Sequence, residues 1–141
     1  MPTVSVVIPA YNSGPYLDGA VQSVIAQTFT DWECIVVDDG STEDLSRVEK
    51  MDPRVRLIRQ ENRGTAAARN NAILHSVGEF IAFLDHDDRW MPGRLESMVG
   101  VIRADPLAGA AAQSQATMPC AEGCYYNEFM VGLIADGIHL V

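Results

Sequence analysis

The sequence predicts an α/β fold, Rossmann-like, with a mostly parallel sheet and flanking helices. Two observations carry this prediction. Short apolar runs that suit strands alternate with segments of helical periodicity along residues 4–103. Two of these runs are apolar at consecutive positions, as expected for strands that helices cover on both faces. With 141 residues, of which 48% are hydrophobic, the chain can form one domain with a buried core.

The first three elements follow from residue type and spacing. A strand is expected at residues 4–9, "VSVVIP", a β-branched run closed by a proline that cannot donate to a sheet ladder. A helix is expected at 15–27, because apolar residues recur there at three- and four-residue steps and a proline suits its first turn. The second strand, 34–37, is continuously apolar and stops at Asp38 and Asp39.

The next five elements continue the alternation. A short helix is expected within 41–50, with a serine or threonine as its N-cap and acidic residues in its first turn. The alternating "RVRLIRQ" predicts a third strand at 54–60. Strong helix formers predict a helix at 65–76, and a fourth strand follows at 79–84. A proline opens the helix expected at 92–103, which has one apolar face.

The sequence after residue 106 is Ala-rich, lacks clear periodicity and predicts no strong strand. We therefore divide the chain into an α/β part at 1–106 and a tail at 107–141 whose structure the pattern does not predict.

Small and acidic residues follow three of the four expected strands. The first strand is followed by "PAYNSG", the second by "DDGS" and the fourth by "DHDD". Because ligands bind outside the carboxyl ends of the strands in an open parallel sheet, we expect a site at this edge. Local chemistry alone leaves an alternative open. Asp38 and Asp39 could equally cap a turn, and the acids of 85–88 could belong to a solvated turn.

The aspartates of the segment 85–88 predict a metal site. Their carboxylates repel one another, and a divalent cation offsets that repulsion. Mg²⁺ and Mn²⁺ take oxygen ligands, typically one or two carboxylates together with substrate phosphates. Asp85 and Asp87 suit a cation that bridges to a diphosphate. His86 lies between them, but on an extended segment its side chain would point away from both, so we do not assign it as a ligand.

The composition argues against several classes of partner and location. A formal net charge of -9 leaves no basic face for a phosphate backbone, so we do not expect a nucleic acid partner. No apolar stretch reaches the roughly 20 residues of a membrane span. The odd number of cysteines, with Cys34 in an apolar run, suits a reducing compartment. We expect a cytoplasmic protein, with peripheral association at the inner face of the membrane as the alternative.

Four blocks of the sequence resemble the family 2 glycosyltransferases of GT-A fold: "VSVVIPAYN", "QTFTDWECIVVDDGSTED", "RVRLIRQENRGTAAARNNAI" and "GEFIAFLDHDDRWMPGRLE". They occur in the family's order and cover residues 4–106. The resemblance implies that 1–106 is the nucleotide-sugar-binding GT-A half. It also implies inverting transfer of a sugar from a nucleotide-diphosphate sugar, a UDP-sugar first of all, to an acceptor, with Mn²⁺ or Mg²⁺ at an Asp-x-Asp motif. Cell-wall or polysaccharide biosynthesis is the implied setting.

The resemblance assigns nucleotide-binding residues to the first two strand ends. It implies that Tyr11 stacks on the base and that the Asp39 carboxylate hydrogen-bonds it. Pro9 and Ala10 line the same pocket through their backbone. Asp38 supports the loop or the ribose end.

The resemblance also implies roles for residues before and after the fourth expected strand. Arg69 faces the nucleotide, where its guanidinium pairs with a phosphate or base oxygen. Asp87 is the preferred metal ligand, and Asp85 lies nearer the ribose or a metal-bound water. Asp88 braces the loop, and Trp90 either walls the sugar or packs in the core.

The resemblance leaves the catalytic base and the acceptor unknown. Family members usually continue through an acceptor-binding half that supplies an Asp or Glu base, so we expect a chain truncated at its C-terminus, with 107–141 as the start of that half. Glu122, Glu128 and Asp136 lie there, but in no motif typical of the base. A truncated sheet would expose a strand edge and favour self-association.

Two other functions compete with a sugar transferase. One is a catalytically idle module that binds a nucleotide sugar and a metal without transferring the sugar. The other is a nucleotidyltransferase, which would need a Gly-rich, basic phosphate loop after the first strand. The sequence "PAYNSGPY" at that position has neither feature, so we rank this function last.

Overall fold

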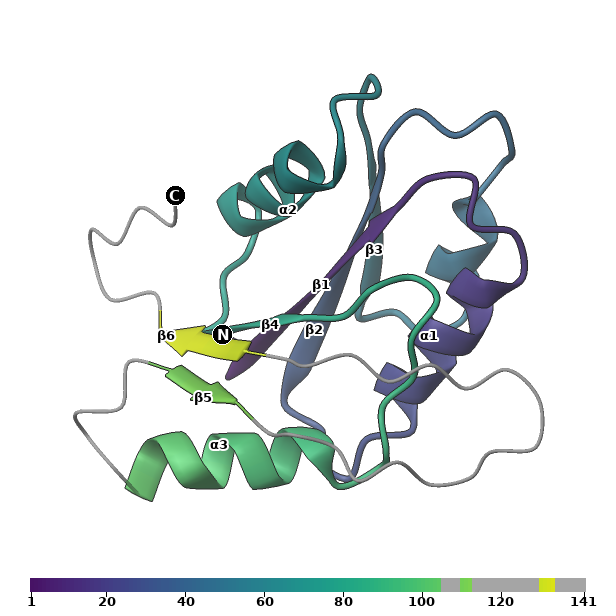
Figure 1. Ribbon diagram of the computed structural model, residues 1–141. Helices are drawn as coiled ribbons and strands as arrows, with labels where there is room; N and C mark the ends of the chain where they lie inside the picture. Colours follow the sequence, from purple (N-terminus) through teal and green to yellow (C-terminus); the bar gives the residue numbers. More distant parts are fainter. Residues whose placement is uncertain (105–109, 113–129, 134–141) are drawn as a thin grey trace.

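The structure, a computed structural model, describes residues 1–104, 110–112 and 130–133. In these residues six strands form one sheet in the order β3-β2-β1-β4-β6-β5 (Figure 1). The strands are β1 Val4–Ala10, β2 Trp32–Asp38, β3 Val55–Arg59, β4 Phe80–Phe83, β5 Ala110–Ala112 and β6 Met130–Leu133. The helices are α1 Tyr16–Ile25, the 3-10 helix η1 Ser46–Lys50, α2 Thr65–Leu74 and α3 Arg94–Ala104.

The strands β1 to β4 run parallel, with β1 between β2 and β4, and β3 lies beyond β2. Only the β4–β6 and β6–β5 pairs are antiparallel. The predicted α/β fold with a mostly parallel sheet and flanking helices is therefore confirmed. Each of the expected helices and strands up to residue 104 is present, with ends that differ by a few residues.

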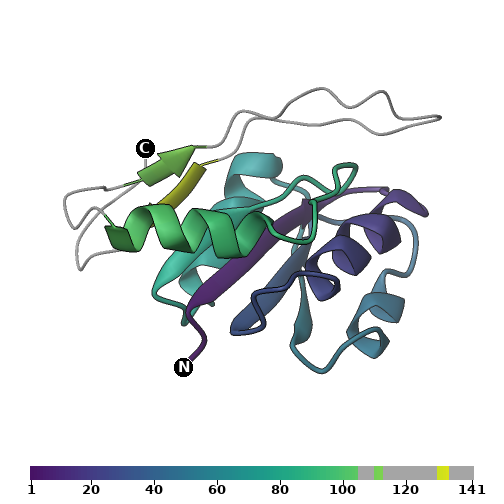
Figure 2. The same cartoon turned by 90° about the horizontal axis from the view of Figure 1, so that it is seen from below.

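Helices cover both faces of the parallel strands. Alternate residues of β1 point to opposite faces: Val6 and Ile8 pack into a core with α1 and α3, whereas Val7 packs into a second core with α2. Figures 1 and 2 show α2 separated from α1 and α3 by the sheet. This two-sided burial explains why β1 and β2 are apolar at consecutive positions.

The strand β1 continues one residue beyond the predicted end at Pro9. The backbone N–H and C=O groups of the odd-numbered residues of β1 point toward β4, since the Leu84 N–H donates to the Val7 carbonyl at 3.0 Å. The β1–β4 ladder ends at Val7. Pro9 therefore needs no N–H donor on that side, and the strand reaches Ala10 beside β2.

Two short strands lie after residue 106, where the sequence shows no strong strand signal. β6 pairs antiparallel with β4, and β5 pairs antiparallel with β6. Both strands are short, with the sequences AAA and MVGL. Alanine and glycine are depleted in strands, so these segments carry little strand signal of their own and depend on the strands beside them for pairing. The division at residue 106 stays a prediction, and Glu122, Glu128 and Asp136 lie outside the described residues.

The outer edge of β3 is partly covered. The Leu57 N–H on this strand donates to Glu49 Oε1 at 3.0 Å, which removes one free donor from the edge. Self-association through an exposed edge stays a prediction. Over the residues that the structure describes, none of the helices has the length and apolar character to cross a membrane.

Candidate functional site

Three strand ends meet at the carboxyl edge of the sheet. β1 and β2 end together, since Ala10 pairs with Asp38 and the Asp39 N–H donates to the Ala10 carbonyl at 2.8 Å. β4 stops earlier, opposite Val7. The loop that begins at Asp85 therefore starts beside the last residues of β1 and leaves space above the end of β4.

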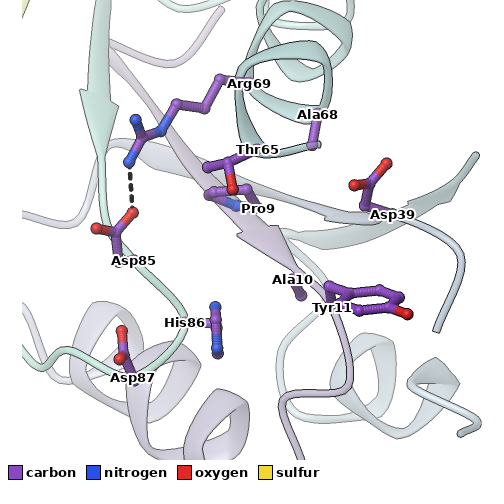
Figure 3. A pocket seen from close by; sticks show the side chains of 10 residues that line it. All are labelled: Pro9, Ala10, Tyr11, Asp39, Thr65, Ala68, Arg69, Asp85, His86 and Asp87. Carbon is purple, nitrogen blue, oxygen red and sulfur yellow. Dashed lines mark hydrogen bonds and ion pairs between the residues drawn. The ribbon is translucent and has the colours of Figure 1, made fainter. Parts of the chain in front are cut away.

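A cavity of about 190 Å³ occupies this edge (Figure 3). The lining residues are Pro9, Ala10, Tyr11, Asp39, Thr65, Ala68, Arg69, Asp85, His86 and Asp87. Every predicted site residue except Asp38 is among them. Figure 3 shows Tyr11 and Asp39 on one side of the cavity and Asp85, His86 and Asp87 on the other.

The Asp39 carboxylate is held by three hydrogen bonds. Oδ1 accepts from the Gln60 side-chain amide at 2.8 Å and from the Arg63 N–H at 2.9 Å, and Oδ2 accepts from the Gly64 N–H at 2.8 Å. Asn71 in turn donates to the Gln60 Oε1 at 2.7 Å and fixes that amide. The carboxylate therefore has a fixed direction, and Oδ2 keeps capacity for one more donor.

These hydrogen bonds also decide the charge of Asp39. Burial alone would raise the pKa of its carboxyl, but the Arg63 N–H, the Gln60 amide and the Gly64 N–H together outweigh it and lower the pKa below the ordinary value. Asp39 is thus an ionised, acceptor-only group at neutral pH.

Asp38 does not line the cavity. Its Oδ1 accepts from the Ser41 N–H at 2.8 Å, and Arg59 lies 3.7 Å from Oδ2. The side chain is almost fully buried. Asp38 therefore braces the turn that carries Asp39. This position agrees with the alternative that Asp38 caps a turn, and with a role in supporting the loop.

The loop after β1 is tied to the loop after β2. The Asn12 N–H donates to Ser41 Oγ at 3.0 Å, the Thr42 N–H donates to Asn12 Oδ1 at 2.9 Å, and the Gly14 N–H donates to Glu43 at 2.7 Å. Asn12 has a positive φ of 46°. These bonds set the direction of the neighbouring Tyr11, whose half-exposed ring is available for stacking at the mouth of the cavity.

Arg69 reaches into the cavity from α2 and pairs with Asp85. Its Nη2 lies 2.6 Å from Asp85 Oδ1 (Figure 3), and its guanidinium lies 5.8 Å from the Phe83 ring centroid. The two residues come from different elements and are brought together only by the fold. The pair places one positive charge among the acidic residues of the cavity.

The segment 85–88 is a turn and not an extended strand end, because the Asp88 N–H donates to the Asp85 carbonyl at 3.1 Å. The expectation that His86 points away from its neighbours is therefore wrong: His86 lines the cavity with Asp85 and Asp87. Asp87 is exposed, and over the described ranges its carboxylate has no hydrogen bond or ion pair.

Asp88 supports this turn from behind. It is buried and interacts electrostatically with Arg94 at the start of α3, while burial lowers the pKa of Arg94 and Asp88 opposes that effect. The Arg94 guanidinium also lies 5.9 Å from the Trp90 ring centroid. Trp90 belongs to the hydrophobic core and does not line the cavity, so its packing role is the one observed.

The carboxylates of the cavity could bind a divalent cation only if another bound molecule supplied further oxygen ligands. Within residues 1–104 and the two short described segments, no group of three or more His, Cys, Asp or Glu side chains could hold a metal by itself. Asp87 and Asp85 would be its protein ligands, and phosphate oxygens would complete the coordination, as is usual for Mg²⁺. The acidic lining, with three carboxylates against the one guanidinium of Arg69, favours a cation there.

Several residues of the site escaped the sequence-based prediction. Thr65 and Ala68 line the cavity from the first turns of α2, and Gln60 and Gly64 orient Asp39. Gly64 has a positive φ of 89° directly before that helix, and a glycine ahead of a run of helix formers was the only local signal for this junction. The partners of Asp39 come from a different loop and could not be read from its neighbours.

The structure combines a parallel α/β sheet with an acidic cavity at its carboxyl edge, an aromatic residue at the mouth and a paired arginine. This edge is where ligands bind in open parallel α/β sheets. The family model "Glycosyl transferase family 2" matches residues 5–130. The chain belongs to this family, and the GT-A fold predicted from the sequence is confirmed.

Three relatives illustrate the similarity. The chain is 37% identical to the Escherichia coli enzyme WfgD, named a UDP-Glc:alpha-D-GlcNAc-diphosphoundecaprenol beta-1,3-glucosyltransferase, over 70% of this chain and 40% of WfgD. S. aureus TarS 1-349 in complex with UDP-GlcNAc superposes with a TM-score of 0.68 at 32% identity, covering 74% of this chain and 32% of that fragment. The mannosyltransferase PcManGT from Pyrobaculum calidifontis, in complex with GDP-Man and Mn2+, superposes with a TM-score of 0.70 at 32% identity. The match covers 77% of this chain and 34% of the PcManGT chain. The chain spans less than half the length of each.

Proposed function

We propose that the cavity binds a nucleotide-diphosphate sugar together with Mn²⁺ or Mg²⁺, as the donor site of an inverting sugar transferase. Tyr11 and Asp39 hold the base, with Pro9 and Ala10 beside it, Arg69 faces the diphosphate, and Asp87 with Asp85 binds the metal. Asp38 acts through the turn that carries Asp39. The family membership and the solved complexes of TarS with UDP-GlcNAc and PcManGT with GDP-Man and Mn2+ support this proposal.

The charge of the cavity is the observation that best supports metal-dependent binding of the donor. Three carboxylates and one guanidinium line it, and a nucleotide diphosphate would add further negative charge to this space. Like charges at such distances repel strongly in a partly buried site. A divalent cation relieves the repulsion and, when bound, stabilises charge on the diphosphate leaving group.

The hydrogen bonds of Asp39 favour a particular kind of base. Its ionised carboxylate can only accept, and Oδ2 keeps room for one donor. Uracil and guanine carry a ring N–H, whereas cytosine and adenine present an unprotonated ring nitrogen at the corresponding position. We therefore expect UDP or GDP to bind more tightly than CDP or ADP, with UDP as the first choice.

Calorimetric titration of the chain with UDP, with and without Mn²⁺, tests the proposal. We expect binding that strengthens when Mn²⁺ is present. Asp87→Ala should remove most of this gain, because it deletes the one carboxylate of the cavity that has no protein partner in the described residues. Glu79→Ala, which changes an exposed carboxylate outside the cavity, is the matched control. Equal Mn²⁺ dependence in Asp87→Ala and the wild type would contradict the metal site.

Transfer to an acceptor also needs a group that takes the proton of the acceptor hydroxyl within hydrogen-bond distance. Asp39 is committed to three donors, and Asp85 and Asp87 are assigned to the metal, so none of the three is suited to this role. The alternative is therefore a module that binds the donor without turnover. Release of UDP from UDP-glucose or UDP-GlcNAc by this chain, with saccharide or lipid-linked acceptors added, would favour the transferase, and tight binding without release would favour the idle module.

A further inference from the structure

The ion pair between Arg69 and Asp85 joins two residues that the proposed function assigns to different ligands. Nη2 of Arg69 lies 2.6 Å from Asp85 Oδ1, and the side chains are 38% and 32% exposed. Ion pairs with this much solvent access contribute little to stability. The interaction can therefore hold Arg69 against Asp85 in the absence of ligand. It is also weak enough for a bound ligand to replace Asp85 as the partner of Arg69.

The pair makes the two metal-binding aspartates unequal. Asp87 is exposed and has no protein partner in the part of the chain that the structure describes. Asp85 already faces a guanidinium, which neutralises it and repels a cation. Before any ligand binds, a metal therefore meets one available carboxylate and one that is occupied.

Arg69 has a second use for its charge. Its Nε atom is buried and has no hydrogen-bond acceptor in the described structure, and the side chain lines the cavity. Guanidinium groups pair well with phosphate, to which they can donate two parallel hydrogen bonds. A phosphate that enters the cavity offers Arg69 an acceptor of higher charge than the single carboxylate it gives up.

We propose that Arg69 is a positioning residue that withholds Asp85 from the metal until the donor diphosphate draws the guanidinium away. This inference rests on the proposed function. It predicts that metal and nucleotide bind cooperatively, with little metal bound in the absence of nucleotide. Because coupling between two ligands is reciprocal, the nucleotide strengthens metal binding by the same factor as the metal strengthens nucleotide binding.

Mn²⁺ affinity in the absence of nucleotide, measured by electron paramagnetic resonance of free Mn²⁺, tests this role. Arg69→Ala should bind Mn²⁺ alone more tightly than the wild type, by about three- to tenfold, because Asp85 becomes available and a positive charge is removed. Arg69→Gln, which keeps most of the side-chain volume, should give the same direction. In both variants UDP should bind more weakly and its coupling to Mn²⁺ should shrink.

Two controls separate the proposed role from a general loss of charge or structure. Arg103→Ala removes an exposed arginine that pairs with Glu79 at 3.5 Å outside the cavity, and should leave the Mn²⁺ affinity unchanged. Adding Asp85→Asn to Arg69→Ala should abolish the gain, because the gain requires the released carboxylate. Thermal melts check that each variant is folded.

Unchanged or weaker Mn²⁺ binding in both Arg69 variants would overturn the inference, as would a gain that survives Asp85→Asn. Failure of the wild type to bind UDP under any condition would overturn the proposed function instead. The comparison with Mn²⁺ alone still decides whether Arg69 withholds Asp85, because it uses no nucleotide.

Discussion

At the scale of single residues, Asp39 connects the stability of the site to its chemistry. Its carboxylate accepts two backbone N–H groups and one side-chain amide. These donors are part-buried, so they need an acceptor whether or not a ligand is bound. The residue proposed to select the base therefore also holds together the loop that follows β3.

Replacing this carboxylate by an amide should destabilise the fold. In Asp39→Asn one of the two side-chain atoms becomes a donor and faces N–H groups, so at least one part-buried donor loses its acceptor. We expect the free energy of unfolding to fall by about 1–3 kcal/mol. Urea denaturation measures it, with Asp87→Asn as the matched control. Asp87 is exposed and has no partner among the described residues, so its variant should lie within about 0.5 kcal/mol of wild type.

The pH dependence of this difference checks its cause. The folded-state pKa of Asp39 is below the ordinary value, so its contribution to stability is present above the unfolded-state pKa, about 3.9. It is lost as the pH falls through the folded-state pKa. The gap between wild type and Asp39→Asn should be constant near neutral pH and narrow below about pH 4. A gap that narrows between pH 6 and 8 would contradict this account.

Motifs in the sequence indicated which residues lie near the cavity, whereas contacts that the fold determines could not be predicted from the sequence. The "DHDD" and "VVDDGS" motifs placed Asp85, Asp87 and Asp39 at the cavity. The motif alone does not show which of Asp38 and Asp39 faces the cavity, because neighbouring residues at a strand end point in different directions. The resemblance gave them different roles, and in the structure only Asp39 lines the cavity. The motifs also misplaced His86, because the turn at 85–88 depends on a backbone hydrogen bond.

At the scale of elements, two glycines should respond oppositely to alanine. Gly40 has a φ of 79°, and an added Cβ would lie 2.8 Å from the Asn62 backbone nitrogen. Gly100 lies within α3, where an added Cβ meets nothing within 4 Å. Gly40→Ala should lower stability by about 1–2 kcal/mol or more. Gly100→Ala should raise it by up to about 1 kcal/mol, because alanine favours the helix.

Thermal unfolding of the two variants beside the wild type measures both effects. The melting temperature should fall for Gly40→Ala and rise for Gly100→Ala. Gly64→Ala gives an intermediate comparison, since its φ of 89° is strained for alanine but no atom lies within 4 Å of the added Cβ. If Gly40→Ala were as stable as the wild type, the tight β2–η1 turn that carries Asp39 would be incorrectly described.

Element prediction depended on the length and periodicity of each segment. α1 and α3 have apolar faces of about three turns, and β1 and β2 are seven-residue strands with runs of apolar residues, so each carries its own signal. β5 and β6 have three and four residues. β6 pairs with β4, and β5 pairs with β6. Such short strands depend on this pairing and not on their own composition, so the sequence could not reveal them.

At the scale of the whole molecule, the central position of β1 determines where the site forms. β1 is flanked by β2 and β4, and α1 and α2 cover opposite faces of the sheet. The crevice above β1 therefore receives residues from the loops after β1, β2 and β4 and from the first turns of α2. This arrangement follows from the sheet order, which the alternation of strands and helices does not specify.

The most direct test of the account is a crystal structure of the chain with UDP and Mn²⁺. We expect electron density for the nucleotide in the cavity, with the base between Tyr11 and Asp39 and an anomalous Mn²⁺ peak beside Asp87. Arg69 should contact the diphosphate and no longer Asp85. Nucleotide bound at another surface, or an Mn²⁺ peak away from Asp87, would contradict the assignment of this cavity as the donor site.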